Sequence, residues 1–168
     1  TPWAIFDRRG AYTGVHTYCR YVRWAARWMV GLRTDVRGRV RVEEVLIAAK
    51  HQSFLDIILI VSVVPRPKFI MKRELLWAPI LGWYAKRIGC VAVDRSGGKE
   101  ARDAMVAALT AGGAEGQLVI YPQGTRVAAG MRAPYRAGVH ALYAETGLPC
   151  VPAAVNTGAI LPRGVALH

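Results

Sequence analysis

The sequence contains few cysteines, and their arrangement predicts neither a disulfide nor a metal site. Its 168 residues include three cysteines, Cys19, Cys90 and Cys150, which are scattered and odd in number. Neither a disulfide framework nor a zinc site follows from such a set, and none of the three lies in a nucleophile motif. We therefore expect buried free thiols and no bound metal.

Long apolar runs and a secretory signal are also missing. No uninterrupted apolar run reaches the roughly 18 residues that a membrane-spanning helix needs, and no signal-peptide pattern is present. The sequence therefore predicts no transmembrane helix among these residues. A chain of 168 residues has the size of one domain that buries most of its apolar surface.

Acidic residues are scarce. Eleven aspartates and glutamates are set against 23 lysines and arginines, which gives a net charge of +12. Such a balance implies an anionic partner, either nucleic acid or a membrane surface rich in acidic lipid. No zinc-finger, RNP or helix-turn-helix pattern is present, and 53% hydrophobic residues is high for a nucleic-acid module. The composition favours the membrane surface.

Residues 11 to 31 predict an amphipathic helix with one apolar and one basic stripe. Tyr21, Trp24 and Trp28 lie together on the flank between the two stripes. Such a helix suits the headgroup level of a bilayer. Residues 1 to 41 hold nine arginines against two aspartates, which is +7 of the total charge. The alternative is an ordinary surface helix packed on the domain by its apolar stripe. The apolar stripe comprises Val15, Tyr18, Cys19, Val22, Ala25, Ala26 and Met29, and the basic stripe His16, Arg20, Arg23 and Arg27.

Strand and helix patterns then alternate, as in an α/β domain with a mixed or mostly parallel sheet flanked by helices. Short buried apolar runs predict the strands, and longer periodic runs bounded by proline or glycine predict the helices. We divide the chain into an N-terminal membrane-contact segment, 1–34, and one domain, 35–168. Strands are expected over 40–49, 68–71, 90–93, 117–121 and 149–155, and helices over 55–64, 74–87 (a pair around Pro79), 99–111 and 138–146.

A histidine and an aspartate, His51 and Asp56, lie five positions apart between a predicted strand and a predicted helix. A carboxylate that accepts a hydrogen bond from one imidazole nitrogen leaves the other nitrogen free to act as a base. The pair is therefore a candidate general base. The alternative is that Ser53 or Asp56 caps the helix and that His51 is a surface loop residue.

Two more loops with basic residues follow predicted strands. The strand that ends at Tyr121 runs into residues 122–126, which end in Gly124-Thr125-Arg126, and the strand that ends at Val93 runs into Asp94 and Arg95. A glycine turn exposes backbone N–H groups, and an arginine adds donors suited to phosphate. Because open α/β sheets bind ligands at strand-terminal loops, the three loops predict one site for an anionic substrate.

Five sequence blocks occur in order between residues 35 and 160: His51 with Asp56, Pro67 to Leu75, Gly89 to Arg95, Tyr121 to Arg126, and Val151 to Asn156. Together they resemble the lysophosphatidic acid acyltransferases (1-acylglycerol-3-phosphate O-acyltransferases) of bacterial type, and so imply the glycerolphosphate acyltransferase fold. One departure is Gln123, where the family usually has glutamate. The amide is nearly isosteric, so the loop geometry should survive, and the departure bears on substrate preference.

The resemblance implies acyl transfer from acyl-CoA or acyl-ACP to the sn-2 hydroxyl of 1-acylglycerol 3-phosphate, giving phosphatidic acid without a further cofactor. A thioester is already activated, so the reaction needs a base, a hold on the acceptor and donors for the oxyanion. His51 is then the base and Asp56 its orienting partner. Substrate-binding residues are expected at Lys72 and Arg126, with Arg95 as a second choice, and at Gln123, Gly124 and Thr125, the last two serving the phosphate or the oxyanion.

Two other functions stay open. Gln123 leaves room for another lyso-lipid acceptor, such as a lyso-ornithine lipid, and the fold could also serve a non-catalytic membrane-surface protein, against which the intact His51 and Asp56 argue. We expect a location at the cytoplasmic face of the inner membrane, and a chain that lacks a stretch at each end of the family's length. One apolar set is expected to be core, with an acyl-channel wall or membrane contact as the alternative: Phe54, Leu75, Leu76, Trp77, Ile80, Leu81 and Trp83.

Overall fold

A computed structural model describes residues 7–93, 100, 103, 106–107 and 116–161. Its five strands form one parallel sheet in the order β3-β2-β4-β1-β5, which confirms the predicted α/β class. The expected helix over 99–111 lies largely outside the described residues. The strands are β1 (Leu46–Ala49), β2 (Pro67–Lys72), β3 (Val91–Val93), β4 (Gln117–Ile120) and β5 (Cys150–Ala153), and the helices are α2 (Arg8–Val30), α3 (Leu55–Val63), α4 (Pro79–Ile88) and α6 (Ala137–Thr146), with short 3-10 helices η1 (Arg73–Trp77) and η2 (Thr157–Ala159).

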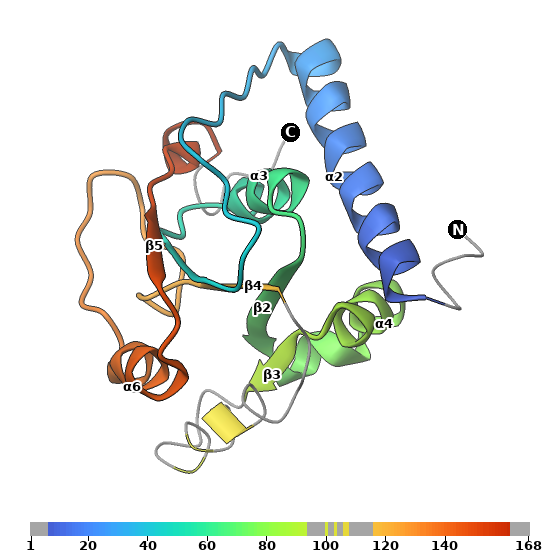
Figure 1. Ribbon diagram of the computed structural model, residues 1–168. Helices are drawn as coiled ribbons and strands as arrows, with labels where there is room; N and C mark the ends of the chain where they lie inside the picture. The colour runs from blue at the N-terminus through green and yellow to red at the C-terminus, as the bar shows by residue number, and fades with distance from the viewer. Residues whose placement is uncertain (1–6, 94–99, 101–102, 104–105, 108–115, 162–168) are drawn as a thin grey trace.

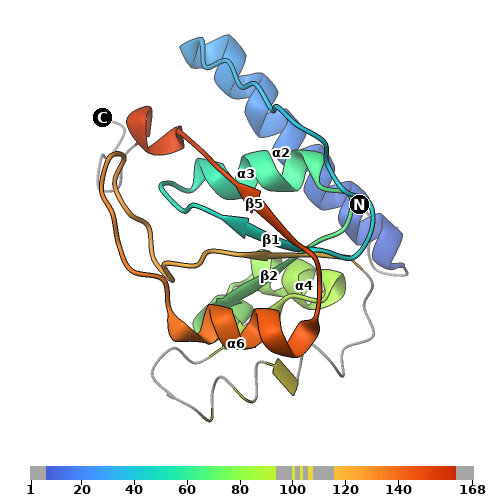
Figure 2. The same cartoon turned by 60° about the vertical axis from the view of Figure 1, so that its left-hand side comes forward.

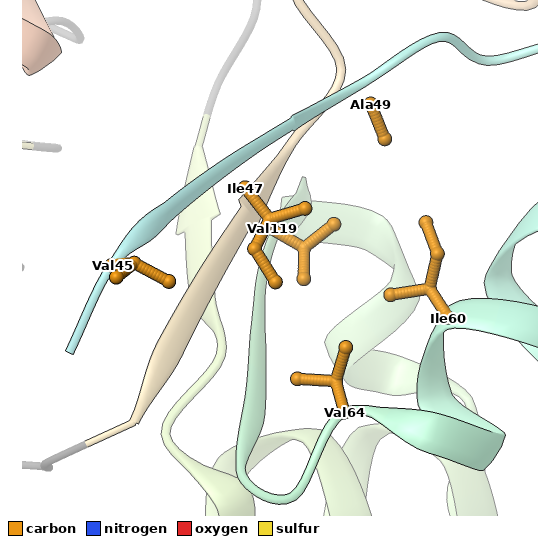
Figure 3. Close-up of a cluster of buried hydrophobic side chains, with 6 residues drawn as sticks. All are labelled: Val45, Ile47, Ala49, Ile60, Val64 and Val119. Carbon is orange, nitrogen blue, oxygen red and sulfur yellow. The ribbon is translucent and has the colours of Figure 1, made fainter. Parts of the chain in front are cut away.

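One face of the sheet packs against α3. Ile47 of β1 and Val119 of β4 point towards Ile60 and Val64, at the end of α3 (Figure 3). Successive side chains of a strand point to opposite faces, so the neighbours of these residues lie on the other face. That arrangement explains why β1 and β4 are apolar at nearly every position, as in parallel sheets covered on both sides.

The other face of the sheet packs against α6. Leu46 of β1 and Leu118 and Ile120 of β4 form a buried cluster with Leu142 of α6. Figure 2 shows α3 and α6 on opposite sides of the sheet. The strands are therefore held between two helical layers, and the carboxyl ends of all five open at one edge.

Helix α2 packs along the outer side of α3 (Figure 1). Its Cys19 is buried with Leu55, Ile58 and Val61 of α3, and Val15 and Val22 pack around this cluster. The first turns of α2 are also fixed to the end of α4, because the Tyr12 hydroxyl donates to the carbonyl of Ile88 at 3.0 Å. The predicted N-terminal helix is thus confirmed, and it is held by the domain along one face.

The faces of α2 differ in detail from the sequence expectation. Tyr18 and Met29, assigned to the apolar stripe, are exposed. Arg23, assigned to the basic stripe, points inward and donates to the hydroxyls of Ser62 and Thr34, both at 2.9 Å. Nε2 of His16 lies 3.1 Å from the carbonyl oxygen of Val64. These inward contacts leave Arg20 and Arg27 as the exposed members of the basic stripe.

Strand β1 is shorter than predicted. It begins at Leu46 rather than at residue 40, because the preceding carbonyls are bonded to a side chain instead of to a strand. The amide nitrogen of Gln117, a fully buried residue, donates to the carbonyls of Val42 and Glu43 at 2.7 and 2.9 Å. The incoming segment is therefore fixed at the amino edge of the sheet.

The three cysteines are free, as expected, but they differ in exposure. Cys19 is buried and Cys90 half-buried, whereas Cys150 is exposed. The expectation of burial is wrong for Cys150 because it lies on β5, an edge strand with alternating exposed residues. Burial raises the pKa of the Cys19 and Cys90 thiols to about 11, so both are protonated at neutral pH.

The apolar set expected in the core is largely at the surface, and that expectation is wrong. Trp77 of η1 is 84% exposed, and Ile80 of α4 is 76% exposed. Helix α4 instead buries its opposite side through Gly82, Ala85 and Ile88. An unusual surface results, comprising Phe54, Leu75, Trp77, Ile80, Leu81 and Trp83.

Candidate active site

Four loops meet at the carboxyl edge of the sheet, because they follow four adjacent parallel strands. In spatial order, β2 ends at Lys72, β4 leads into residues 121–126, β1 leads into residues 50–56, and β5 leads into η2. The carboxyl edge is the usual place for ligands in open α/β sheets. The topology thus places the predicted site residues Lys72, Gln123–Arg126 and His51 on neighbouring strands.

His51 and Asp56 are in direct contact. Nδ1 of His51 lies 2.9 Å from Oδ2 of Asp56, and Asp56 is fully buried. When Nδ1–H donates to the carboxylate, Nε2 is the nitrogen that accepts a proton. The predicted pairing is therefore observed, and its geometry suits a general base.

Asp56 also closes the turn at the start of α3. Its Oδ2 accepts the backbone N–H groups of Gln52 at 2.6 Å and Ser53 at 3.0 Å. The hydroxyl of Ser53 in turn accepts the N–H of Leu55 at 3.0 Å. Of the two alternatives in the sequence, histidine pairing is observed. The N-cap of α3 is Phe54, which has no side-chain cap hydrogen bond, so Asp56 and Ser53 order the turn that leads into the helix instead of capping it.

The hydrogen bonds around Asp56 keep it ionised. Burial acts to raise the pKa of this carboxyl, but bonds from His51, Thr157, Ser53 and Gln52 outweigh it and hold the pKa below its ordinary value. A carboxylate with this many donors is also fixed in orientation. At neutral pH, His51 therefore faces a negative charge in a constant position.

The His51 ring is fixed from a second side by Tyr121. The two rings are stacked, with their centroids 4.0 Å apart and an angle of 20° between their planes. The backbone carbonyl of His51 accepts the N–H of Val127 at 2.8 Å. The side chain nevertheless stays 16% exposed, so the imidazole is held rigidly and remains accessible from the edge of the sheet.

The loop after β4 makes a tight turn at Gly124. Its φ of +69° is in the left-handed region, which glycine adopts at little cost, and its N–H donates to the carbonyl of Tyr121 at 2.8 Å. The side chain of Arg136 lies so close that a Cβ at Gly124 would be 3.2 Å from its Cγ. A second arginine, which the sequence analysis did not identify, therefore lies beside this turn.

The predicted substrate-binding residues differ in exposure. Thr125, Arg126 and Lys72 are exposed, whereas Gln123 is 6% exposed, and its Oε1 has no hydrogen-bond partner among the described residues. Arg95 lies outside the described residues. In the part of the chain described, no cluster of histidine, cysteine, aspartate or glutamate is suited to hold a metal ion.

The structure adds site residues that the sequence analysis missed. The hydroxyl of Thr157, in η2, donates to Oδ1 of Asp56, and Oε1 of Gln52 accepts the N–H of Gly158 at 3.1 Å. Thr157 and Asp56 are 101 positions apart, so no local pattern reveals their contact. The one available signal was that a Thr-Gly pair follows the last predicted strand.

Comparisons with known proteins agree with this architecture. The acyltransferase family model matches residues 33–156. The 1-acyl-sn-glycerol-3-phosphate acyltransferase of Pseudomonas aeruginosa is 32% identical over 156 residues, covering 89% of this chain and 59% of that protein. The alpha form of that enzyme from Mus musculus is 29% identical over 137 residues, covering 79% of this chain and 48% of that protein.

Among solved structures, the 1-acyl-sn-glycerophosphate acyltransferase PlsC of Thermotoga maritima shares the fold. The TM-score is 0.70 at 23% identity, covering 95% of this chain and 66% of that one. The chain spans less than two thirds of the length of these relatives. Since the family model covers most of the chain, the resemblance seen in the sequence is confirmed, and the chain belongs to the acyltransferase family.

Proposed function

We propose that this protein transfers an acyl group from acyl-CoA or acyl-ACP to the sn-2 hydroxyl of 1-acylglycerol 3-phosphate, giving phosphatidic acid. His51 Nε2 takes the proton of the acceptor hydroxyl as its oxygen attacks the thioester carbonyl. Asp56 holds the imidazole and stabilises the imidazolium that forms. The thiolate of the donor leaves as the tetrahedral intermediate collapses, and the imidazolium proton neutralises it.

The observation that carries this proposal is the His51–Asp56 contact at the carboxyl edge, beside the Gly124 turn. A buried carboxylate that fixes the tautomer of an accessible imidazole suits proton abstraction rather than passive binding. The curated relatives named above are acyltransferases that act on 1-acylglycerol 3-phosphate, which supports the choice of acceptor.

The direct test is His51→Ala, assayed with acyl-CoA and 1-acylglycerol 3-phosphate. Loss of a general base should lower kcat by about 10²–10⁴-fold. Asp56→Asn should also lower kcat, because the amide can favour the wrong tautomer. His140→Ala is the matched control, since His140 is exposed on α6 and should leave kcat unchanged.

Near wild-type turnover in His51→Ala would exclude this mechanism. A wild-type protein that acylates a lyso-ornithine lipid but not lysophosphatidic acid would keep the mechanism and replace the acceptor. Absence of turnover with both acceptors and both donors, in a folded protein that binds vesicles, would support a non-catalytic membrane-surface protein instead.

We further propose that Arg126 and Lys72 hold the acceptor phosphate, with Arg95 as a second choice. Lys72 ends β2, and Arg126 lies in the loop that follows the adjacent strand β4. Both side chains are exposed, which suits a dianionic group placed between them. The buried Gln123 and the backbone N–H of Thr125 complete this loop, serving the phosphate or the oxyanion. The N–H of Gly124, expected to share that task, donates to the carbonyl of Tyr121, so Gly124 contributes the turn itself.

Finally, we propose that residues 1–34 bring the acyltransferase domain, 35–168, to a membrane surface rich in anionic lipid, at the cytoplasmic face of the inner membrane. The outward side of α2 is aromatic: Trp28 is 75% exposed, and Tyr21 and Trp24 are exposed beside it. Tryptophan, tyrosine and arginine on one helix suit the headgroup level. No helix in the described ranges is long and apolar enough to span a bilayer.

A further inference from the structure

We propose that Thr157 is a positioning residue for the His51–Asp56 pair, acting as the third member of a hydrogen-bonded chain His51–Asp56–Thr157. The inference rests on the proposed role of His51 as the base. It concerns how the protonation of His51 is controlled, whichever lyso-lipid is the acceptor.

The two oxygens of Asp56 have different partners. Oδ2 accepts the His51 ring and two backbone N–H groups, whereas Oδ1 accepts the Thr157 hydroxyl. Thr157 is 2% exposed and Asp56 is fully buried. Because water is excluded from both residues, this hydroxyl serves a carboxylate oxygen that solvent does not reach.

The position of Thr157 is set by the sheet and by a second contact. Strand β5 pairs with β1, with Ala49 opposite Ala153, so the turn after β5 lies beside the His51 loop. The Gln52 side chain accepts the N–H of Gly158, and a Cβ at Gly158 would come within 2.8 Å of the Gln52 Cβ. The glycine therefore lets the turn approach closely enough for the Thr157 hydroxyl to reach Asp56.

The Thr157 hydroxyl controls the basicity of the Asp56 carboxylate. A donor on Oδ1 stabilises the negative charge of Asp56, and so weakens it as a partner for the imidazolium. Without that donor the carboxylate becomes more basic, while Gln52 and Ser53 still hold it beside His51. The proton on the coupled pair is then released at higher pH, so a smaller share of His51 is in its active, unprotonated form at each pH on the acidic limb.

The test compares Thr157→Val, which keeps the shape but removes the donor, with Thr157→Ser, which keeps the donor. In the intact protein, imidazole titration is followed by NMR without substrate, with His51 identified by His51→Ala and His140 as the internal reference. Thr157→Val should move the His51 midpoint, and the acidic limb of kcat, upward by on the order of one pH unit. Thr157→Ser should restore both.

Kinetics and stability separate positioning from mere packing. On the acidic limb, below both midpoints, Thr157→Val should lower kcat about 10-fold with both KM values unchanged, and the two proteins should converge at higher pH. If Thr157→Val does not fold, Gly158→Ala replaces it, because the added methyl pushes the Thr157 turn away from Gln52 and should give the same upward shift.

A His51 titration that is the same in the wild type and in the folded donor-free variant would overturn the inference, even if thermal stability falls. The outcome is separable from the proposed function. A shifted titration in a protein that acylates neither lysophosphatidic acid nor lyso-ornithine lipid keeps this inference and rejects the function. An unshifted titration in an active enzyme rejects this inference alone.

Discussion

Asp56 connects folding with chemistry at the scale of a single residue. It accepts two backbone N–H groups of the turn that leads into α3 and the imidazole N–H that it orients. A carboxylate near a helix N-terminus also interacts favourably with the helix dipole. The same charge thus stabilises the loop and holds the base, so its replacement should affect both stability and turnover.

Arg126 is the residue on which acceptor recognition is most directly tested. Arg126→Ala should raise KM for the phosphorylated acceptor by about 10- to 150-fold, since a charge-assisted hydrogen bond contributes roughly 1.5–3 kcal/mol. The KM for the acyl donor should change little. Arg126→Lys should rescue only in part, because an ammonium lacks the planar fork of guanidinium. Steady-state kinetics with each substrate varied in turn gives the answer.

Arg41→Ala is the matched control for Arg126→Ala. Arg41 is exposed next to Val42, whose carbonyl is bonded at the amino edge of the sheet, opposite the site. If Arg126→Ala raised KM for the acyl donor and not for the acceptor, Arg126 would belong to the donor side. The phosphate proposal would then be withdrawn.

Gln123→Glu tests the departure from the family pattern. The side chain is nearly isosteric, so the Gly124 turn should persist, and transfer to lysophosphatidic acid should be maintained or increased. The measurement is the ratio of kcat/KM for lysophosphatidic acid and a lyso-ornithine lipid in both proteins. A folded variant that loses transfer to lysophosphatidic acid would show that the amide is required there.

At the scale of elements, α2 has two different sides. One side, with Val15, Cys19 and Val22, is bound to α3, and the other presents Trp24 and Trp28, whose rings lie 6.3 Å apart. Exposed apolar patches often mark surfaces that bind another protein or a membrane, and the two tryptophans are the basis of the proposed membrane contact. The surface of η1 and α4 around Trp77 adds to this argument.

Trp24→Ser combined with Trp28→Ser should weaken binding to anionic vesicles without lowering the melting temperature. Arg20→Glu with Arg27→Glu should weaken it as well, since each basic residue near such a surface contributes about 1 kcal/mol, and added salt should act in the same direction. Vesicle sedimentation measures both effects. Tyr143→Ser is the control, because Tyr143 is exposed on α6, on the other side of the sheet.

Arg23 should behave differently from its neighbours on α2. Arg23→Ala removes two hydrogen bonds, to Ser62 and Thr34, and should lower the free energy of unfolding by about 1–2 kcal/mol. Its effect on vesicle binding should be smaller than that of Arg20 and Arg27.

Equal sedimentation of the Trp24→Ser, Trp28→Ser variant and the wild type at every salt concentration would make α2 a purely structural helix.

At the scale of the whole molecule, Asp56 makes stability depend on pH. Its folded-state pKa is held below its ordinary value of 3.8. The folded state therefore binds this proton less readily than the unfolded state, and the stabilisation is complete above pH 3.8. It is lost as the pH falls through the lower, folded-state pKa.

Urea unfolding of the wild type and of Asp56→Asn, between about pH 6 and about pH 3, tests this linkage. The wild type should be the more stable by a constant amount at the upper end. The difference should shrink at the lower end, because only the wild type has a carboxylate to protonate at this position. A difference independent of pH would show that Asp56 is not an ionised group in the folded protein.

The amino-acid sequence by itself determined the elements and the chemistry that is local in the chain. Apolar runs bounded by glycine and proline placed β4, α3 and the carboxyl end of β1 correctly to within one residue, because burial on two faces needs continuous apolar sequence. The contact of His51 with Asp56 was predictable for a related reason. Five positions of turn and helix cannot separate the two side chains widely.

Tertiary structure alone decided contacts between distant segments and the exposure of apolar side chains. The Thr157–Asp56 bond arises because β5 lies beside β1. The first residues of the predicted strand over 40–49 are not in the strand, because the Gln117 side chain binds the carbonyl of Val42. Trp77 and Ile80 were expected in the core because their side chains are strongly apolar. Whether an apolar side chain is buried depends on how its element packs, and the packing of η1 and α4 leaves these two exposed.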